Sequence, residues 1–556
     1  MKSYIILSFA SLLTLPLAAQ SVVDGTRFGS TDITGTARYR SMAGAFGALG
    51  GDPSSMTDNP AGMGIYRGTS EITFTPNLSF AHTTLDASQE TKRRRADSSL
   101  SNLSYVLSFK TSSAEHLVNF NIGLGFNHSQ GLVRKYKMVQ DQSSSSFGAY
   151  LANRTNNALL YTGQYDNAGS YMGSDASWSN NFIPLSSLYA FDCYALDLPK
   201  DANDQAINDQ GVVATSDLGY QRLFVKEQNR NDEYNINFSA NWDDFIYGGL
   251  TVSIADFNSM INTEFNEDET YDYSGNYIQY FNDLETKGTG VNIKAGILIK
   301  PTDRWRLGVA VHTPTWYHMK DLYSGYMKTE STKEYSGGET YTFKYRYYSP
   351  WEYQISSAWV LGQKALLSLE YDMKNFKSQK FKADYDDDYT TFSDLNSTIK
   401  DYTAIQHTFK AGAEYRVTDN FSVRCGYAYK SSPYDKSLMD HPNASRGWTN
   451  GFYGDDNTLL FDSSTKPNHT LLDDQHFICA GIGWHNDWFF VDLACTNHIM
   501  KEFVSAYPTT DALYKYDYDS GEATMTTDPN FGATTGDYSD LKTHLLKWDL
   551  SIGFKF

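Results

Sequence analysis

Apolar and polar residues alternate with a period of two along much of this chain. The pattern is clearest at 118–127, at 365–374 and at 546–556, where large aliphatic or aromatic residues take every second position. Asn, Ser, Gly, Lys and Asp fill most of the positions between them. Each segment is therefore predicted to be a β-strand with one apolar and one polar face.

Extending this reading over the whole sequence gives 14 strand candidates. They are 71–86, 99–111, 116–137, 219–242, 245–264, 288–300, 305–325, 341–361, 365–381, 403–416, 421–432, 473–484, 488–502 and 544–556.

Both a soluble sandwich and a membrane barrel would show this alternation. Two features favour the barrel. Many runs reach about 12 residues or more, whereas strands of globular proteins usually have about 5–6 and a tilted membrane crossing takes about 9–11. The junctions also alternate between tight turns, such as 243–244, and long loops at 138–218, 433–472 and 503–543.

Short turns at one end and long loops at the other are typical of bacterial outer-membrane barrels. An even number of strands follows if both chain ends lie on the short-turn, periplasmic side. We therefore expect an all-β fold, a 14-stranded antiparallel transmembrane barrel spanning 71–556. Aromatic residues make up 15% of the chain, and girdles at the two membrane interfaces would use many of them.

The first 20 residues have the layout of a secretory signal peptide. Lys2 precedes a largely apolar run from Tyr4 to Leu17, and the small residues Ala18 and Ala19 follow. We expect cleavage near Ala19 or Gln20. No other stretch approaches the ~20 consecutive apolar residues of a spanning helix.

The formal net charge of −19 argues against nucleic-acid partners, because an acidic chain repels phosphate backbones. The one basic run, at 92–95, is interpreted as a solvated loop tip between two strands. The four cysteines are widely spaced and form no C-x-x-C pair, so a metal site is not expected. A disulfide stays open.

The motifs of catalysis are missing from the sequence. No H-E-x-x-H or G-x-S-x-G segment occurs, and no Ser and His pair stands out on neighbouring strands. Asp384, Asp386 and Asp388 imitate the start of a calcium-binding loop, but Tyr389 replaces the turn glycine. An acidic surface loop is the simpler interpretation, and we expect neither an enzyme nor a cofactor.

Residues 21–70 differ from the rest of the chain. They are rich in glycine, with Phe46, Met56, Met63 and Ile65 spaced among small residues. Short helices are predicted over 37–49 and from Pro53 to Asp58, with Pro60 ending the second. A flexible periplasmic linker would not need the large apolar residues, so the segment is interpreted as a hatch folded inside the barrel.

Two motifs in this segment carry a resemblance. Arg40-Ser41-Met42-Ala43-Gly44-Ala45-Phe46 is followed by a segment from Asp52 to Asn59-Pro60-Ala61-Gly62, and a 14-strand pattern ending in Phe556 comes next. The whole resembles the FadL/TodX family of outer-membrane transporters for long-chain fatty acids and other hydrophobic compounds. The segment PTDRWRLGVAVHTPTWYHMKDLY at 301–323 is a looser match to the same family.

The resemblance implies a mechanism. Outer loops would catch an apolar ligand, a greasy cavity would receive it, and movement of the hatch would release it sideways through a gap at a kink in the third strand. Carried over to this chain, the hatch residues are Phe46, Asn59, Pro60, Ala61 and Gly62. Gly123, Gly125 and Gly131 are candidates for the kink, although inward-facing glycines can equally make room for a plug.

Three classes of function stay open at this stage. Uptake of hydrophobic molecules such as fatty acids by a monomer in the outer membrane, in contact with its lipid, is the first. Barrels similar to this family also serve as shuttles in type IX protein secretion, which is the second. A barrel lipase is the third, and the missing catalytic pair makes it the weakest.

Overall fold

The computed structural model describes most of the chain beyond the first 19 residues. The described residues are 20–111, 116–141, 143, 146–178, 183–207, 210–215, 219–268, 277–332, 336–384, 392–436, 451–453, 459–461, 469–507, 514–517, 522–525 and 538–556. The predicted signal peptide, except for Gln20, lies outside them, and so do Asp386 and Asp388. Within these ranges, no helix has the length and apolar character needed to cross a membrane.

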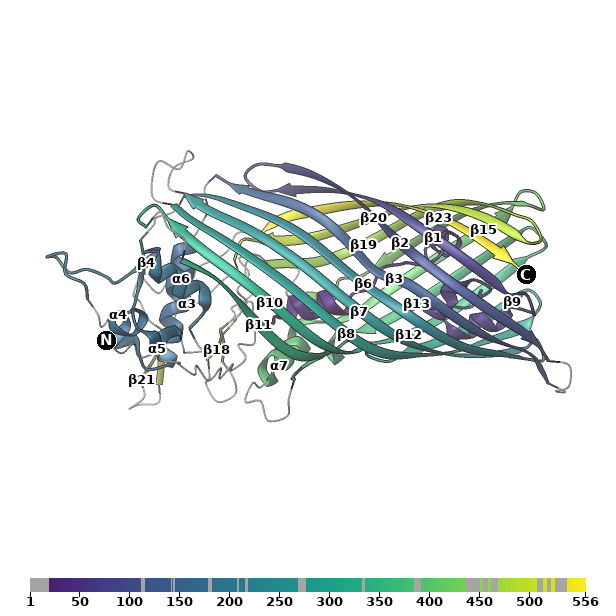
Figure 1. The fold of residues 1–556 in the computed structure, drawn as a ribbon, viewed down its shortest axis with the longest axis horizontal. Helices are drawn as coiled ribbons and strands as arrows, with labels where there is room; N and C mark the ends of the chain where they lie inside the picture. Colours follow the sequence, from purple (N-terminus) through teal and green to yellow (C-terminus); the bar gives the residue numbers. More distant parts are fainter. Residues whose placement is uncertain are drawn as a thin grey trace, which may run out of the picture.

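The main sheet is a closed, antiparallel barrel of 14 strands (Figure 1). Eleven strands run unbroken: β1 (Glu71–Asp86), β2 (Thr91–Lys110), β3 (Leu117–Gln140), β6 (Tyr220–Trp242), β7 (Ile246–Asp268), β8 (Tyr277–Thr302), β15 (Ile405–Arg416), β16 (Phe421–Lys430), β19 (His469–His485), β20 (Phe489–Ser505) and β23 (Ser539–Lys555). Each pairs with the next along the chain, and β1 pairs with β23 to close the ring.

The other three strands are interrupted. They are β9 (Trp305–His312) with β10 (Trp316–Thr329), β11 (Ser336–Tyr348) with β12 (Trp351–Leu361), and β13 (Ala365–Asn375) with β14 (Lys380–Ala383). Pro314 and Pro350 lie in the first two breaks, where the missing backbone N–H cannot join a ladder. A 3₁₀ turn, η4 (Phe376–Ser378), makes the third. The continuous strands predicted at 305–325, 341–361 and 365–381 are therefore wrong in detail.

The barrel has its apolar side chains outside and its polar side chains inside. Large side chains such as Phe238, Ile297 and Ile355 are about half exposed on the outer face, at 53%, 55% and 61%. The inward positions of the same walls carry buried Asn, Ser and Thr, for example Asn237 and Thr251. A soluble sandwich would bury the apolar face, so this arrangement decides between the two folds that the sequence allowed.

The wall is much taller on one side than on the other. β6 and β7 each have 23 residues and β8 has 26, whereas β15 has 12 and β16 has 10. β2 is also longer than predicted, so the basic run at 92–95 lies within it, paired with residues 81–84 of β1. These residues are not a loop tip, because the hairpin turn comes at 87–90 instead.

Residues 20–70 fold inside the barrel as short helices joined by coil (Figure 1). The helices are α1 (Val22–Gly29), α2 (Ala37–Ser41), η1 (Pro53–Met56) and η2 (Pro60–Ile65). α2 ends early because Ala43 and Gly44 have positive φ values of 53° and 72°, so the helix predicted over 37–49 is wrong in its length. The prediction that Pro60 ends a helix is wrong, because Pro60 begins η2 directly after the cap Asn59. We call residues 20–70 the hatch segment.

Helices also cover the end of the barrel at which the long strands β6, β7 and β8 project. α3 (Phe147–Tyr161), α4 (Ala168–Met172), α5 (Asp175–Trp178) and α6 (Leu185–Asp192) follow β3, with the turn η3 (Tyr165–Asn167) between α3 and α4. Phe147, Leu151 and Tyr189 are buried against inward residues of the tall wall such as Phe265 and Tyr280. These helices therefore form a packed lid.

The remaining short elements are β4 (Leu196–Asp197), β5 (Val213–Ala214), α7 (Ser393–Tyr402), β17 (Gly451–Tyr453), β18 (Leu459–Phe461), β21 (Tyr514–Asp517) and β22 (Glu522–Met525). All four cysteines are free thiols, so none of them forms a disulfide.

Candidate functional site

The hatch segment is seated on the tall wall through the Asn-Pro-Ala motif. Asn59 is fully buried, its Nδ2 donates to the carbonyl of Gly47 at 2.6 Å, and its Oδ1 accepts from the N–H of Ala61 at 3.1 Å. Asn237 of β6 donates to the carbonyl of Pro60 at 3.4 Å. Gly249 of β7 lets the backbone of Pro60 come so close that any side chain there would collide with it.

Phe46 directly precedes Gly47, the residue whose carbonyl accepts from Asn59. Its ring is fully buried, 5.4 Å from the ring of Tyr39, and the guanidinium of Arg38 sits over it. Gly62 packs against Gly50 and Ser55. Asn59, Pro60, Ala61 and Gly62 lie beside β6, β7 and β8 of the wall, whereas Phe46 belongs to an apolar cluster with Ala358 of β12, Ala428 of β16 and Phe477 of β19. The bond from Asn59 to the carbonyl of Gly47 joins the two groups.

The three glycines of β3 do not form one group. A Cβ added to Gly123 would lie 2.6 Å from the sulfur of Met56, and one added to Gly125 would lie 3.0 Å from its methyl carbon. Both glycines therefore make room for the hatch segment, which is the simpler of the two readings. Gly131 is separate from them, and its nearest neighbour is the ring of His128 in its own strand.

The wall is open at one seam beside Gly131. β2 and β3 are paired from Lys110↔Asn119 up to Asn102↔Asn127 and no further. Above that point β2 continues to pair with β1, and β3 with β6. Residues 91–101 of β2 and 128–140 of β3, all within the described part of the chain, share no ladder. We call this interval the β2–β3 seam.

The seam begins at an irregularity in β3. The register between β3 and β6 shifts between His128 and Gln130, so the inward face changes from odd to even residue numbers. The hatch segment uses the released backbone, since the N–H of Asp32 donates to the carbonyl of Ser129 at 2.9 Å. Three bonds cross the rest of the seam. The hydroxyl of Thr83 of β1 donates to the carbonyl of Lys135 at 2.6 Å, that of Thr91 donates to the carbonyl of Lys137, and the N–H of Gln89 donates to the carbonyl of Val139 at 3.4 Å.

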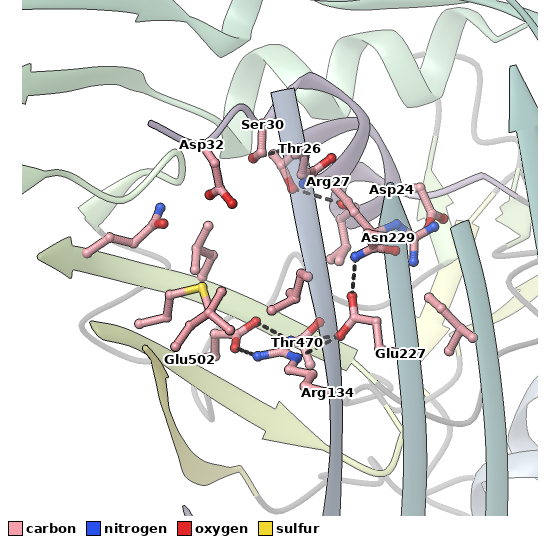
Figure 2. Close-up of a pocket in the computed structure, with 18 of the residues that line it drawn as sticks. Asp24, Thr26, Arg27, Ser30, Asp32, Arg134, Glu227, Asn229, Thr470 and Glu502 are labelled. Atoms are coloured by element: carbon pink, nitrogen blue, oxygen red, sulfur yellow. Dashed lines mark hydrogen bonds and ion pairs between the residues drawn. The ribbon is translucent and has the colours of Figure 1, made fainter. Parts of the chain in front are cut away.

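A cavity of about 100 Å³ lies directly behind this seam (Figure 2). Helix α1 forms one side, and inward residues of β3, β6, β7, β19, β20 and β23 form the others. The apolar lining residues are Val23, Leu132, Tyr136, Val225, Ile261, Leu472, Met500 and Leu545. Leu132 and Tyr136 belong to the unpaired stretch of β3, so the cavity borders the seam.

A buried ion cluster forms the polar end of this cavity. Arg134 donates to Glu227 at 2.8 Å and to Glu502 at 2.9 Å (Figure 2). It also donates to the hydroxyl of Thr543 at 3.1 Å. The one guanidinium thus bonds both carboxylates, and the cluster keeps one net negative charge at this end of the cavity. No motif in the sequence pointed to these residues, which come from four distant strands.

Helix α1 is held at the opposite side by several contacts. Ser21 and Asp24 form a capping box, and Asp24 also pairs with Arg27 at 2.7 Å. The hydroxyls of Thr26 and Tyr434 lie 2.6 Å apart. Beyond the end of α1, Asp32 pairs with Lys547 at 2.8 Å. Burial raises the pKa of Asp32, but Lys547 and His498 outweigh this effect and hold the pKa well below its usual range.

A second cavity, of about 130 Å³, lies lower down between the hatch segment and the wall. Its lining is charged: Lys294 pairs with Glu233 at 2.6 Å and Lys374 with Glu352 at 2.8 Å. Of these two cavities, the one behind the β2–β3 seam has the more apolar lining.

Asp58 of the hatch segment extends this charged layer. Its carboxylate lies 3.8 Å from Lys410, which also contacts Glu370 at 2.6 Å and Asp372 at 2.7 Å. Burial raises the pKa of Asp58 to about 6, although Lys410 opposes the shift. Within the described residues, no group of His, Cys, Asp and Glu side chains could hold a metal ion.

No family model matches the chain, and no curated protein matches it either. Solved structures do. A FadL homologue from Pseudomonas aeruginosa aligns with 94% of this chain and 99% of its own, with a TM-score of 0.51 and 13% identity. The chain has the FadL fold.

Two further structures align over the same share of this chain with lower scores. The toluene transporter TodX of P. putida has a TM-score of 0.45 and 12% identity, with 99% of its chain covered. The toluene transporter TbuX of Ralstonia pickettii has a TM-score of 0.41 and 11% identity, again with 99% covered. At these identities the likeness to FadL extends to the fold alone.

Proposed function

We propose that the protein takes up hydrophobic molecules through a bacterial outer membrane and releases them sideways into the bilayer. A molecule would enter past the lid, occupy the cavity behind the β2–β3 seam, and leave through the seam when the hatch segment moves. The observation that carries the proposal is the missing ladder between β2 and β3, directly beside an interior cavity that has apolar side chains along part of its lining.

The physical reason for a lateral route is the free-energy cost of moving an alkyl chain through water. Each methylene group that passes from an apolar site into water loses about 0.8 kcal/mol, so a through-channel is a poor path for an alkyl chain. A side exit joins an apolar cavity to the apolar bilayer. The half-exposed aliphatic side chains of the outer wall, such as Ile236, supply the apolar surface on the other side.

The size of the cavity adds a requirement. It has about 100 Å³, whereas an engineered cavity of about 150 Å³ is known to hold benzene. A long-chain fatty acid therefore needs α1 to move before it can bind. The hatch residues Phe46, Asn59, Pro60, Ala61 and Gly62 are proposed as the seat about which the segment moves, and Gly131 as part of the kink.

The test is a disulfide across the seam. In a background without the four native cysteines, Thr91→Cys with Lys137→Cys would tie β2 to β3. We expect the cross-link to lower uptake of a fluorescent long-chain fatty acid about tenfold, and a reducing agent to restore it. The matched control is Tyr105→Cys with Leu124→Cys, which ties two residues already opposite each other in the continuous ladder. Unchanged uptake with the seam cross-link formed would refute lateral release.

Lipid extraction of the purified protein would identify the class of ligand. Bound fatty acid favours long-chain uptake, and retention of small aromatics alone favours a narrower substrate. Co-purified secreted proteins, with no change of uptake in a deletion strain, would favour the alternative role in type IX secretion.

A further inference from the structure

A row of lysines crosses three neighbouring strands on the outer face of the barrel. Lys320 of β10 lies directly opposite Lys287 of β8 on one side and Lys344 of β11 on the other. All three side chains are exposed and point outward. We call these three residues the lysine row.

More cations lie beside the row. Arg346 of β11 is opposite Lys382 of β14, and it is also opposite His318 of β10. These positions lie one outward residue nearer the apolar belt than the lysine row. The basic cluster thus covers four adjacent strands of a chain whose net charge is −19.

Like charges directly opposite each other in a sheet are destabilising. Lys287 has a partner, because Glu285 of its own strand lies 2.6 Å away. Among the described residues, no carboxylate lies within ion-pair distance of Lys320 or Lys344. The middle and one end of the row therefore lack a counter-charge on the described surface.

The lysine row lies just beyond the apolar outer surface of the barrel. Ile297, Ile293 and Val291 are exposed aliphatic residues of β8, and Lys287 is the second outward residue after Val291. Trp316, opposite Val291, is 41% exposed at the same level. At about 3.4 Å per residue, the lysine row lies roughly 13 Å along the strand from Val291, or about 10 Å above it after tilt.

We propose that the lysine row binds the phosphate monoester headgroup of a lipid in the outer leaflet. The inference rests on the proposed orientation of the barrel, with its long strands outside. Adjacent strands are about 4.8 Å apart, so the row spans about 10 Å and can contact more than one phosphate. Each ammonium donates charge-assisted hydrogen bonds to phosphate oxygens. The acyl chains would lie on Val291, Ile293 and Trp316 below.

The test uses the purified full chain in detergent and native mass spectrometry. The probe is a diphosphorylated disaccharide lipid, and the same lipid without phosphates is the comparison. Each cation near a charged headgroup contributes about 1 kcal/mol, so K287Q/K320Q/K344Q should weaken binding by at least tenfold. The control R304Q/K364Q/R416Q removes the same charge from exposed residues at the short-turn end and should leave binding unchanged.

Three results would overturn the proposal. The first is equal binding by the lysine-row variant and the wild type. The second is equal binding of the dephosphorylated lipid. The third is full competition by millimolar inorganic phosphate, which would mean a site for free anions.

If the variant does not fold, the salt dependence of wild-type binding tests the proposal instead. Binding should fall at least tenfold between 0.1 and 0.5 M salt. Binding that does not depend on salt refutes the proposal. Loss of fatty-acid uptake is not expected in the lysine-row variant. Failure of this proposal is therefore distinguishable from failure of the proposed transport.

Discussion

Two of the regions of the barrel wall that the hatch segment touches differ in how they are built. β6 and β7 are paired residue by residue from Tyr220↔Asp268 to Trp242↔Ile246, with no shift of register. The β2–β3 seam has no ladder at all over 91–101 and 128–140. The Asn-Pro-Ala motif rests on the first, and Asp32 contacts the second.

This difference suggests separate roles for the two contacts of the hatch segment, the one at Gly249 and the one at Ser129. Around Gly249 the backbones of hatch and wall meet closely, so a shift of the motif would have to move a wall that is fully hydrogen-bonded. At Ser129 one backbone hydrogen bond joins the hatch segment to a strand already free of its neighbour. We infer that the hatch segment is fixed at the tall wall and released at the seam.

Removing the hatch segment should have the largest effect. Deletion of 21–68 leaves a lumen lined by Asn, Ser and charged side chains, which water and ions can cross. We expect single-channel conductance in planar bilayers to rise at least about tenfold. The control is an unchanged β-sheet signal in circular dichroism, and unaltered conductance in a folded barrel would show that the segment does not obstruct it.

Gly249→Ala tests the fixed end. The added methyl group meets the backbone of Pro60, which cannot turn aside, and overpacking of this kind costs about 1–3 kcal/mol. Thermal unfolding should report the loss, and protease should cut the hatch segment more readily.

The matched control is Gly125→Ala, where the added methyl group meets only the flexible end of Met56. We expect less than about 0.5 kcal/mol there. Equal losses at the two glycines would remove the distinction between the close backbone contact at β7 and the yielding side-chain contact at β3.

The smallest effect is a dependence on pH that has opposite signs in the two regions. Asp58 has a pKa raised to about 6, so its protonated form stabilises the hatch below about pH 4, and this contribution is lost as the pH rises to 6. Lys410, Glu370 and Asp372 face it and set the size of the change. Protease sensitivity of the hatch segment should therefore increase over this window.

Asp58→Asn should abolish that increase. The comparison is Asp32→Asn at the seam. Asp32 has a lowered pKa, so its contribution is present above about pH 4 and is lost only on further acidification. The same pH response in both variants would contradict the opposite signs.

Much of the fold could be predicted from the period-two pattern. The alternation of Leu, Trp and Phe with Lys and Asp at 546–556 gives both the strand and its two faces. What it cannot give is the break within a strand, because strand-like runs lie close on both sides of Pro314 and Pro350. The two prolines were visible in the sequence, and the restriction they place on the backbone was the available signal.

The ion pairs of the interior escaped the sequence analysis for another reason. Lys410, Glu370 and Asp372 look like the polar face of a strand, and the alternation alone does not give the register that sets Lys410 of β15 directly opposite Glu370 of β13. Inward-facing lysines at alternate positions of several strands were the signal that could have found this layer. The seam was expected at a glycine, but the register shift falls between His128 and Gln130.

The unequal height of the wall has one more consequence. Strands of 23 residues at a tilt of about 40° rise roughly 55–60 Å, about twice the 30 Å of a bilayer core, whereas the 10 residues of β16 barely cross it. The ends of the strands therefore form an oblique rim, which is high at β6, β7 and β8 and low at β15 and β16. In the proposed orientation, a molecule that arrives along the membrane would meet the low side of this rim first, with β6, β7 and β8 rising behind it.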